Sequence, residues 1–70
     1  MYAYRHDGAL GRIHAHLSIG RGIVLRVDPV EPRSIPDGST VLLEPGDVLV
    51  TSEPYEHPEL VEVDVMLSIQ

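Results

Sequence analysis

The sequence predicts an all-β fold: a single small barrel or sandwich of five to six short, mostly antiparallel strands. Three observations lead to this prediction. Apolar and polar residues alternate with a period of two in several segments, and no segment holds the 3.6-residue apolar period of a helix. Glycine or proline interrupts the middle of the chain every few residues. The apolar residues include nine Val and five Ile, whose β-branched side chains favour strands.

The first predicted strands lie in the N-terminal half. In residues 12–19 the polar side chains, with His14 and His16 among them, share one face, and the apolar ones share the other face: Ile13, Ala15, Leu17 and Ile19. A second strand is expected over residues 23–27. Residues 2–6 are a possible further strand, and we expect His6 in this terminal stretch to be a surface residue.

The second half of the chain is divided by turns. Residues 29–38 hold three prolines and are predicted to form a loop that closes on a Pro-Asp-Gly turn. Residues 40–43 are a predicted strand, Glu44-Pro45-Gly46-Asp47 fits a type II turn, and residues 47–52 are expected to be the hairpin partner. A last strand is predicted over residues 61–69, with Val61, Val63, Val65, Leu67 and Ile69 facing inward.

These elements predict one domain over residues 1–70 with a small core. The expected inward set is Ile13, Leu17, Leu25, Val41, Val63, Val65 and Leu67. A chain of this length buries only about 60% of its unfolded surface, and without cysteine it has no disulfide to stabilise it. We therefore expect a protein partner or self-association to supply part of the stability.

Charge is distributed unevenly along the chain. The first 35 residues hold all five arginines against Asp7, Asp28 and Glu31, a net charge of +2, whereas residues 36–70 hold eight carboxylates and no Lys or Arg, a net charge of −8. Scattered arginines do not make a phosphate-binding patch, so no nucleic-acid partner is expected. The unlike halves can pair within one chain or head-to-tail between copies, and both arrangements stay open.

Membrane insertion and secretion are not expected from the sequence. No stretch approaches the roughly 18 consecutive apolar residues of a membrane helix. The N-terminal segment carries Arg5 and Asp7 and lacks the apolar centre of a signal peptide. We expect a cytoplasmic protein or a part of a particle that is assembled inside a cell.

The histidines and the acidic series are the candidates for chemistry. Side chains two residues apart on a strand project together, so His14 and His16 are either two solvated residues or two ligands of one metal ion, with His57 as the third. Four glutamates recur at every third position, but Pro54 and Pro58 exclude a helix there, and we expect a solvated loop: Glu53, Glu56, Glu59 and Glu62.

The histidine spacing resembles the two motifs of the cupin family. Gly8 precedes His14 by five intervening residues, His16 completes a His-x-His pair, and Gly46 precedes His57 by ten. The resemblance covers residues 8–57 and implies a small β-barrel whose three histidines bind one divalent transition metal. The sequence departs from the family because Gly20 and Arg21 stand where its acidic ligand belongs.

Two functional hypotheses follow. The leading one is a small non-catalytic protein that acts by protein–protein contact, as an accessory or assembly subunit such as a structural protein of a virus particle, with no cofactor. No serine lies in a Gly-x-Ser-x-Gly nucleophile motif. The alternative is a minimal cupin-like enzyme that uses a metal held by His14, His16 and His57.

Overall fold

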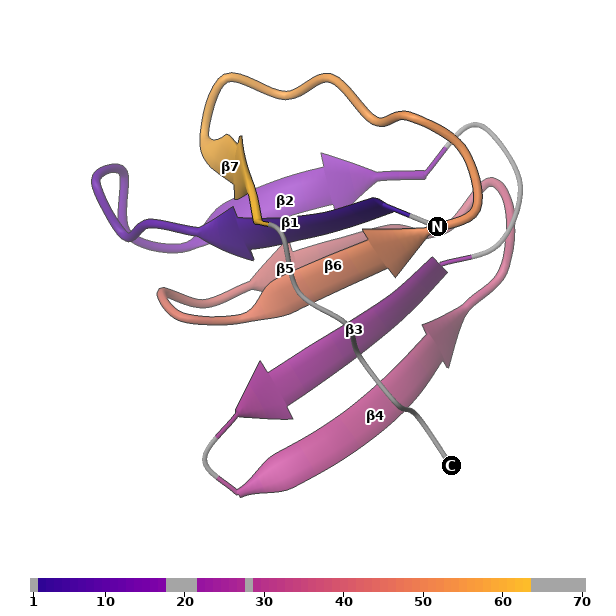
Figure 1. The fold of residues 1–70 in the computed structure, drawn as a ribbon, viewed down its shortest axis with the longest axis horizontal. Helices are drawn as coiled ribbons and strands as arrows, with labels where there is room; N and C mark the ends of the chain where they lie inside the picture. The colour runs from indigo at the N-terminus through magenta and orange to yellow at the C-terminus, as the bar shows by residue number, and fades with distance from the viewer. Residues whose placement is uncertain (1, 18–21, 28, 64–70) are drawn as a thin grey trace.

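The computed structural model describes residues 2–17, 22–27 and 29–63, which form two antiparallel sheets and no helix. Five strands form one sheet in the order β4-β3-β6-β1-β7, and β2 pairs with β5 in the other (Figure 1). The bounds are β1 Tyr2–His6, β2 Ile13–His16, β3 Gly22–Val27, β4 Val30–Ile35, β5 Thr40–Leu43, β6 Val48–Thr51 and β7 Leu60–Glu62. The sheets do not close into a barrel. The prediction of an all-β fold of short antiparallel strands is confirmed. The described residues form seven strands rather than the five to six predicted, and the two sheets are consistent with a sandwich rather than a barrel.

The main core lies between the two sheets. On β2 the period-two prediction is confirmed, because Ile13 and Ala15 are buried whereas His14 and His16 are exposed. The residues of this core come from both sheets and from the segments that connect them: Tyr4, Ile13, Ala15, Leu17, Val24, Ile35, Leu43, Leu49, Tyr55 and Leu60. Burial of this apolar surface is the main favourable contribution to folding.

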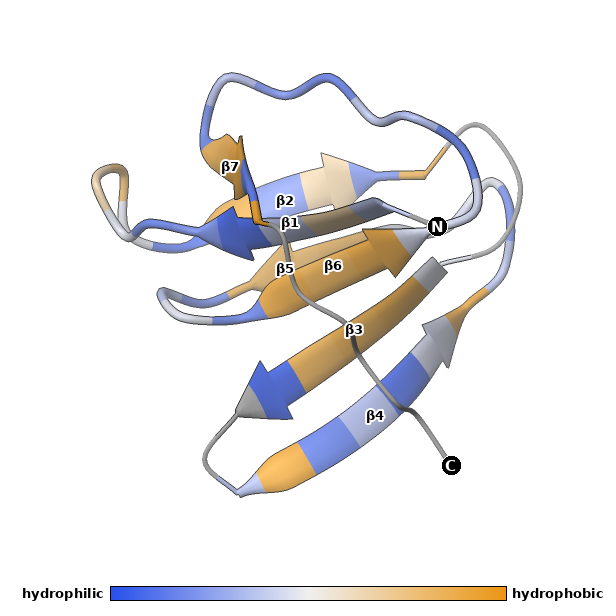
Figure 2. Cartoon of the chain, viewed as in Figure 1, coloured by the Kyte–Doolittle hydropathy of each residue, from blue (hydrophilic) through white to orange (hydrophobic). Residues whose placement is uncertain are grey.

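The central strand β6 is apolar on both faces, as its continuous hydrophobic colour in Figure 2 shows. Leu49 faces the core between the sheets. Val48 and Val50 face the other way and form a smaller cluster with Ala3 and Leu25. All four residues of β6 are buried, which is typical of a strand with neighbours on both sides.

The predicted hairpin between residues 40–43 and 47–52 is wrong, although its turn is correct. The Asp47 amide donates to the Glu44 carbonyl at 3.0 Å, and Gly46 has a φ of 92°, as a type II turn requires. However, this turn joins the two sheets: β5 pairs with β2, whereas β6 pairs with β1 and β3. The reason is the burial of β6: all four of its residues are buried, and the centre of the larger sheet is the position that buries both of its faces.

The prediction of a loop over residues 29–38 is also wrong, because β4 occupies most of that segment. β4 pairs with β3 along its whole length, and Pro32 lies opposite Leu25. A proline has no N–H to donate, so it is tolerated where its nitrogen faces away from the neighbouring strand. β4 meets this condition because it is an edge of the sheet. The Pro36-Asp37-Gly38 turn that follows is as predicted, with a φ of 84° at Gly38.

The last strand begins at Leu60, one residue before the predicted start, and over the described residues its buried side differs from the prediction. Leu60 is buried, whereas Val61, which was expected to face inward, is 46% exposed. Of the other predicted inward residues, Ile13, Leu17 and Leu25 are buried. Val41 and Val63 are partly buried against the two clusters. Val65, Leu67 and Ile69 lie outside the described residues.

Asp47 joins the turn between the sheets to the strand β3. Its side chain is only 3% exposed. Its carboxylate accepts the Glu44 amide at 2.9 Å and both Nε and Nη2 of Arg26 at 3.2 Å. This hydrogen bond and the charge of Asp47 raise the pKa of Arg26 above its ordinary value. Glu44 adds ion pairs to Arg12 and Arg26, at 3.2 and 3.6 Å. Arg12 and Arg26 are therefore paired with Glu44 and Asp47 of the turn within one chain.

We predict that Asp47→Asn lowers the free energy of unfolding by about 1.5–3 kcal/mol, the range for hydrogen bonds to a charged group. Urea unfolding followed by circular dichroism measures this change. Asp37→Asn removes the same charge at an exposed turn and is the control, with an expected change within about 0.5 kcal/mol. Equal stability of the two variants would contradict the role of Asp47.

Candidate functional site

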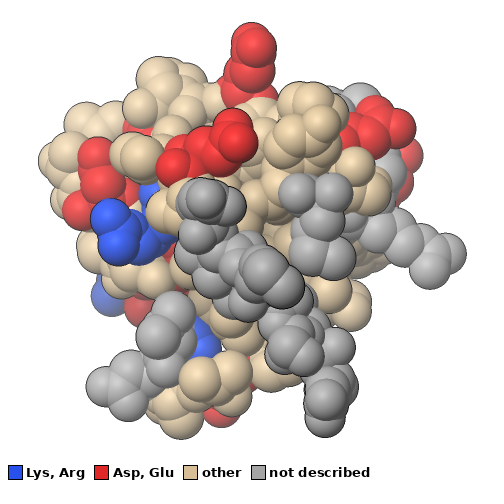
Figure 3. Space-filling view, viewed as in Figure 1, with Lys and Arg blue, Asp and Glu red and all other residues tan. Residues whose placement is uncertain are grey.

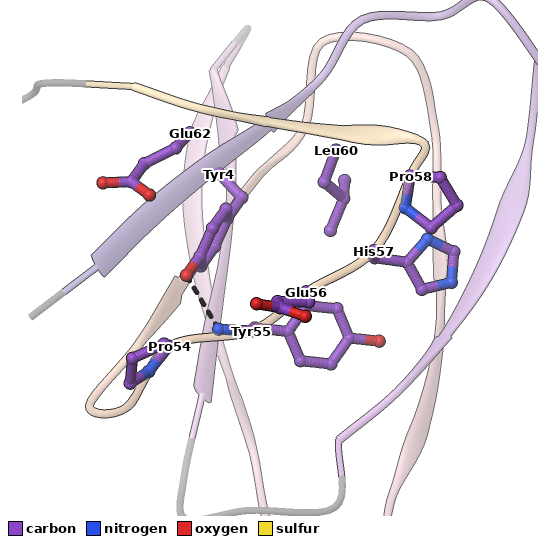
Figure 4. Close-up of a pocket in the computed structure, with 8 residues that line it drawn as sticks. All are labelled: Tyr4, Pro54, Tyr55, Glu56, His57, Pro58, Leu60 and Glu62. Carbon is purple, nitrogen blue, oxygen red and sulfur yellow. Dashed lines mark hydrogen bonds between the residues drawn. The ribbon is translucent and has the colours of Figure 1, made fainter.

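The candidate site is an open cavity formed by the segment between β6 and β7. This segment, residues 52–59, passes over one side of the sandwich (Figure 1), and β1 and β7 complete the walls. It forms the predicted irregular loop. The cavity has a volume of about 620 Å³. Eight residues line it (Figure 4): Tyr4, Pro54, Tyr55, Glu56, His57, Pro58, Leu60 and Glu62.

Tyr55 holds this loop to both sheets. Its amide donates to the hydroxyl of Tyr4 on β1 at 2.7 Å, the bond drawn in Figure 4. Its own hydroxyl donates to the carbonyl of His16 on β2 at 3.1 Å. The rings of Tyr4 and Tyr55 meet edge-on, with centroids 6.2 Å apart. The two side chains are 6% and 9% exposed, and burial raises the pKa of Tyr55.

His57 and Glu59 form a pair at one side of the cavity. The His57 ring lies parallel to the Tyr55 ring, with centroids 5.8 Å apart and an angle of 2° between the planes. Nδ1 of His57 meets the carboxylate of Glu59. The stacking on Tyr55 and the contact with Glu59 together orient the imidazole. The sequence predicted His57 as a metal ligand and Glu59 in a solvated loop; the two-residue spacing of Tyr55, His57 and Glu59 is the signal for this pairing.

The acidic loop surface, which we define as Glu53, Glu56, Glu59 and Glu62, gives the site its charge. Figure 3 shows Asp and Glu residues at the top of the molecule, where the loop between β6 and β7 passes. Glu53, Glu56 and Glu62 are exposed, and none has an ion pair with another residue that the structure describes. Among the described residues, Glu53, Glu56 and Glu62 therefore present unpaired negative charge to solvent, whereas Glu59 contacts His57.

His6 lies behind the site, and the expectation that it is a surface residue is wrong. Its side chain is 1% exposed. Nε2 bonds to the Gly11 carbonyl, and Nδ1 lies 3.4 Å from the Glu59 carbonyl and 3.5 Å from the Gly8 amide. The period of two along β1 places His6 on the same buried side as Tyr4, which is the signal that sequence reasoning missed.

The structure does not bring the three predicted metal ligands together. His14 and His16 project from the exposed face of β2, and Nδ1 of His16 lies 3.0 Å from the Thr40 hydroxyl. His57 is paired with Glu59 on the loop. In residues 2–17, 22–27 and 29–63, no three His, Cys, Asp or Glu residues are grouped so as to hold a metal ion. The described residues do not fit the metal centre that the cupin resemblance implies.

Comparison with known proteins finds no match to a family model, a curated protein or a solved structure. The part of the chain that the structure describes has no helix long and apolar enough to cross a membrane. The site is therefore interpreted from its own geometry.

We predict that Tyr55 ionises at a higher pH than a tyrosine of the unfolded chain, because burial raises its pKa. The unfolded chain releases the phenol proton near pH 10, so Tyr55 contributes stability that is full below about pH 10 and is lost as pH rises through its higher folded pKa. The difference in absorbance at 295 nm between the wild type and Tyr55→Phe during an alkaline titration follows the ionisation of Tyr55. Ionisation of Tyr55 near pH 10, as in the unfolded chain, would contradict its burial.

For the histidines, we predict that the double substitution His14→Ser with His16→Ser changes the free energy of unfolding by less than about 0.5 kcal/mol, since both side chains are solvated.

Zinc titration of tag-free protein at pH 7, followed by calorimetry, should give the same weak binding for the wild type and for His57→Ala. Tight zinc binding that is lost when any one of the three histidines is replaced would instead support the cupin-like alternative.

Proposed function

We propose that this chain is a small non-catalytic interaction protein, an accessory or assembly subunit such as a structural protein of a virus particle, that binds a basic protein partner through its acidic loop surface. One observation carries the proposal. The loop is fixed to both sheets by Tyr55, and it presents carboxylates that have no cationic partner among the described residues. A surface held in place in this way is preorganised for binding.

The charge distribution favours a basic partner over a second copy of the chain. Arg12 and Arg26 are already paired within the chain with Glu44 and Asp47. The full sequence carries a net charge of −6. Two copies therefore repel each other at long range, whereas a basic partner is attracted to the acidic loop surface.

The edges of the larger sheet favour contact through side chains over strand addition. β4 forms one edge, and Pro32 removes a backbone donor from the middle of that strand. β7 forms the other edge, and it has three residues in the part of the chain that the structure describes. Prolines and short strands at sheet edges are common protections against pairing with another chain. This supports a partner that is recognised by charge and shape.

The test uses purified components. Wild-type protein is used to capture a partner from cells, the partner is identified and purified, and binding is measured by calorimetry. We predict that Glu56→Gln with Glu62→Gln weakens binding at least about ten-fold, and that 1 M salt does the same, because screening there shortens to about 3 Å.

Glu31→Gln with Asp37→Asn is the matched control, since it removes two exposed carboxylates away from the loop. This variant should bind within about two-fold of the wild type. Equal weakening by the two double variants, or no partner that binds again in purified form, would contradict the proposed function. Self-association that only the loop variant abolishes would place a second copy in the partner's role.

A further inference from the structure

The cavity beneath the acidic loop surface contains a buried hydroxyl whose hydrogen bonding is half complete. The Tyr4 hydroxyl accepts the Tyr55 amide at 2.7 Å, yet within residues 2–17, 22–27 and 29–63 its own proton has no acceptor. Tyr4 is 6% exposed and lines the cavity. Buried polar groups normally use their donors, so this position calls for an acceptor such as a carbonyl oxygen.

Carboxylates with no described partner line the same cavity. Glu56 and Glu62 come from the loop and from β7, and the structure assigns neither of them a hydrogen bond or an ion pair among the residues it describes. In the view of Figure 4, the Glu56 carboxylate lies by the Tyr55 ring and the Glu62 carboxylate lies on the opposite side of Tyr4. Their charge calls for a cation with several N–H donors.

The remaining lining is apolar and comes from Leu60 and the rings of Pro54 and Pro58. Such a surface suits the aliphatic stem of a long side chain whose charged head reaches the carboxylates. An arginine residue within a peptide has all three features: a carbonyl acceptor, an aliphatic stem and a guanidinium with five donors.

We propose that this cavity binds one arginine residue of an extended segment of the basic partner. A backbone carbonyl of the segment accepts the Tyr4 hydroxyl proton, and the guanidinium lies between the carboxylates of Glu56 and Glu62. This proposal rests on the proposed function and adds the recognition element. The loop is preformed for it, because Tyr55 and the paired His57 and Glu59 fix the wall.

The test titrates isotope-labelled protein with N-acetyl-arginine-N-methylamide and follows the amide resonances. We expect saturable shifts centred on Tyr55, Leu60 and Glu62. The citrulline analogue has the same shape without the charge and should bind at least about ten-fold more weakly. Propylguanidine keeps the cation without the carbonyl, and we expect it to bind several-fold more weakly.

Variants give a second readout. Glu56→Gln with Glu62→Gln should weaken binding of the arginine compound at least about ten-fold, and Glu31→Gln with Asp37→Asn should leave it within about two-fold. Equal binding of the arginine and citrulline compounds, or shifts that spread over all exposed carboxylates without saturation, would overturn the proposal; this comparison of ligands needs no variant to fold.

Failure of this proposal is distinguishable from failure of the proposed function. If a purified partner binds in a way that depends on Glu56 and Glu62 but the arginine compound does not enter the cavity, only the arginine assignment fails. If the compound binds and no partner is found, the cavity assignment holds and the proposed function fails.

Discussion

The hydrogen bond from the Tyr55 amide to the buried Tyr4 hydroxyl is the contact on which the candidate site depends. The loop between β6 and β7 contains two prolines and forms no strand or helix, so its backbone cannot be held by a ladder of hydrogen bonds. Tyr55 replaces that ladder: its amide is bonded to β1, its hydroxyl to the carbonyl of His16, and its ring fills the core between the sheets. The same residue therefore serves packing and function, because the loop it fixes carries the acidic loop surface.

A second constraint explains why that surface keeps its charge. The turn between the sheets brings Glu44 and Asp47 to Arg12 and Arg26, so these two arginines are paired away from the loop. In the described residues, no arginine pairs with the glutamates of the loop. The uneven distribution of charge along the sequence thus gives an uneven surface charge, which is negative over the cavity. Net charge and its asymmetry act on association with partners, not on the choice of fold.

The local sequence pattern predicted which segments form strands and turns better than it predicted which strands pair with each other. The alternation on β2, the strand β5 and the two glycine turns followed from side-chain period and turn chemistry, which are local properties. Which strand pairs with β5 depends on burial of β6 on both faces, a property of the whole sheet that short-range pattern does not contain. β4 was not predicted because proline normally interrupts a strand. The sequence does not show that this strand lies at the edge of the sheet, where a proline is tolerated. In the site, the acidic series was correctly placed on a loop, whereas the role of Tyr55 depends on residues 51 and 39 positions away in the sequence.

Amide hydrogen exchange at Tyr55 tests the central contact most directly. A loop amide exposed to water exchanges at the rate of an unstructured peptide, whereas one bonded to a buried acceptor exchanges only when the structure opens. We predict that the Tyr55 amide is protected at least about 100-fold and that Tyr4→Phe, which removes the acceptor, abolishes this protection while the amides of β6 stay protected. Exchange of Tyr55 at the free peptide rate in the native protein would contradict the anchoring of the loop and, with it, the preformed site.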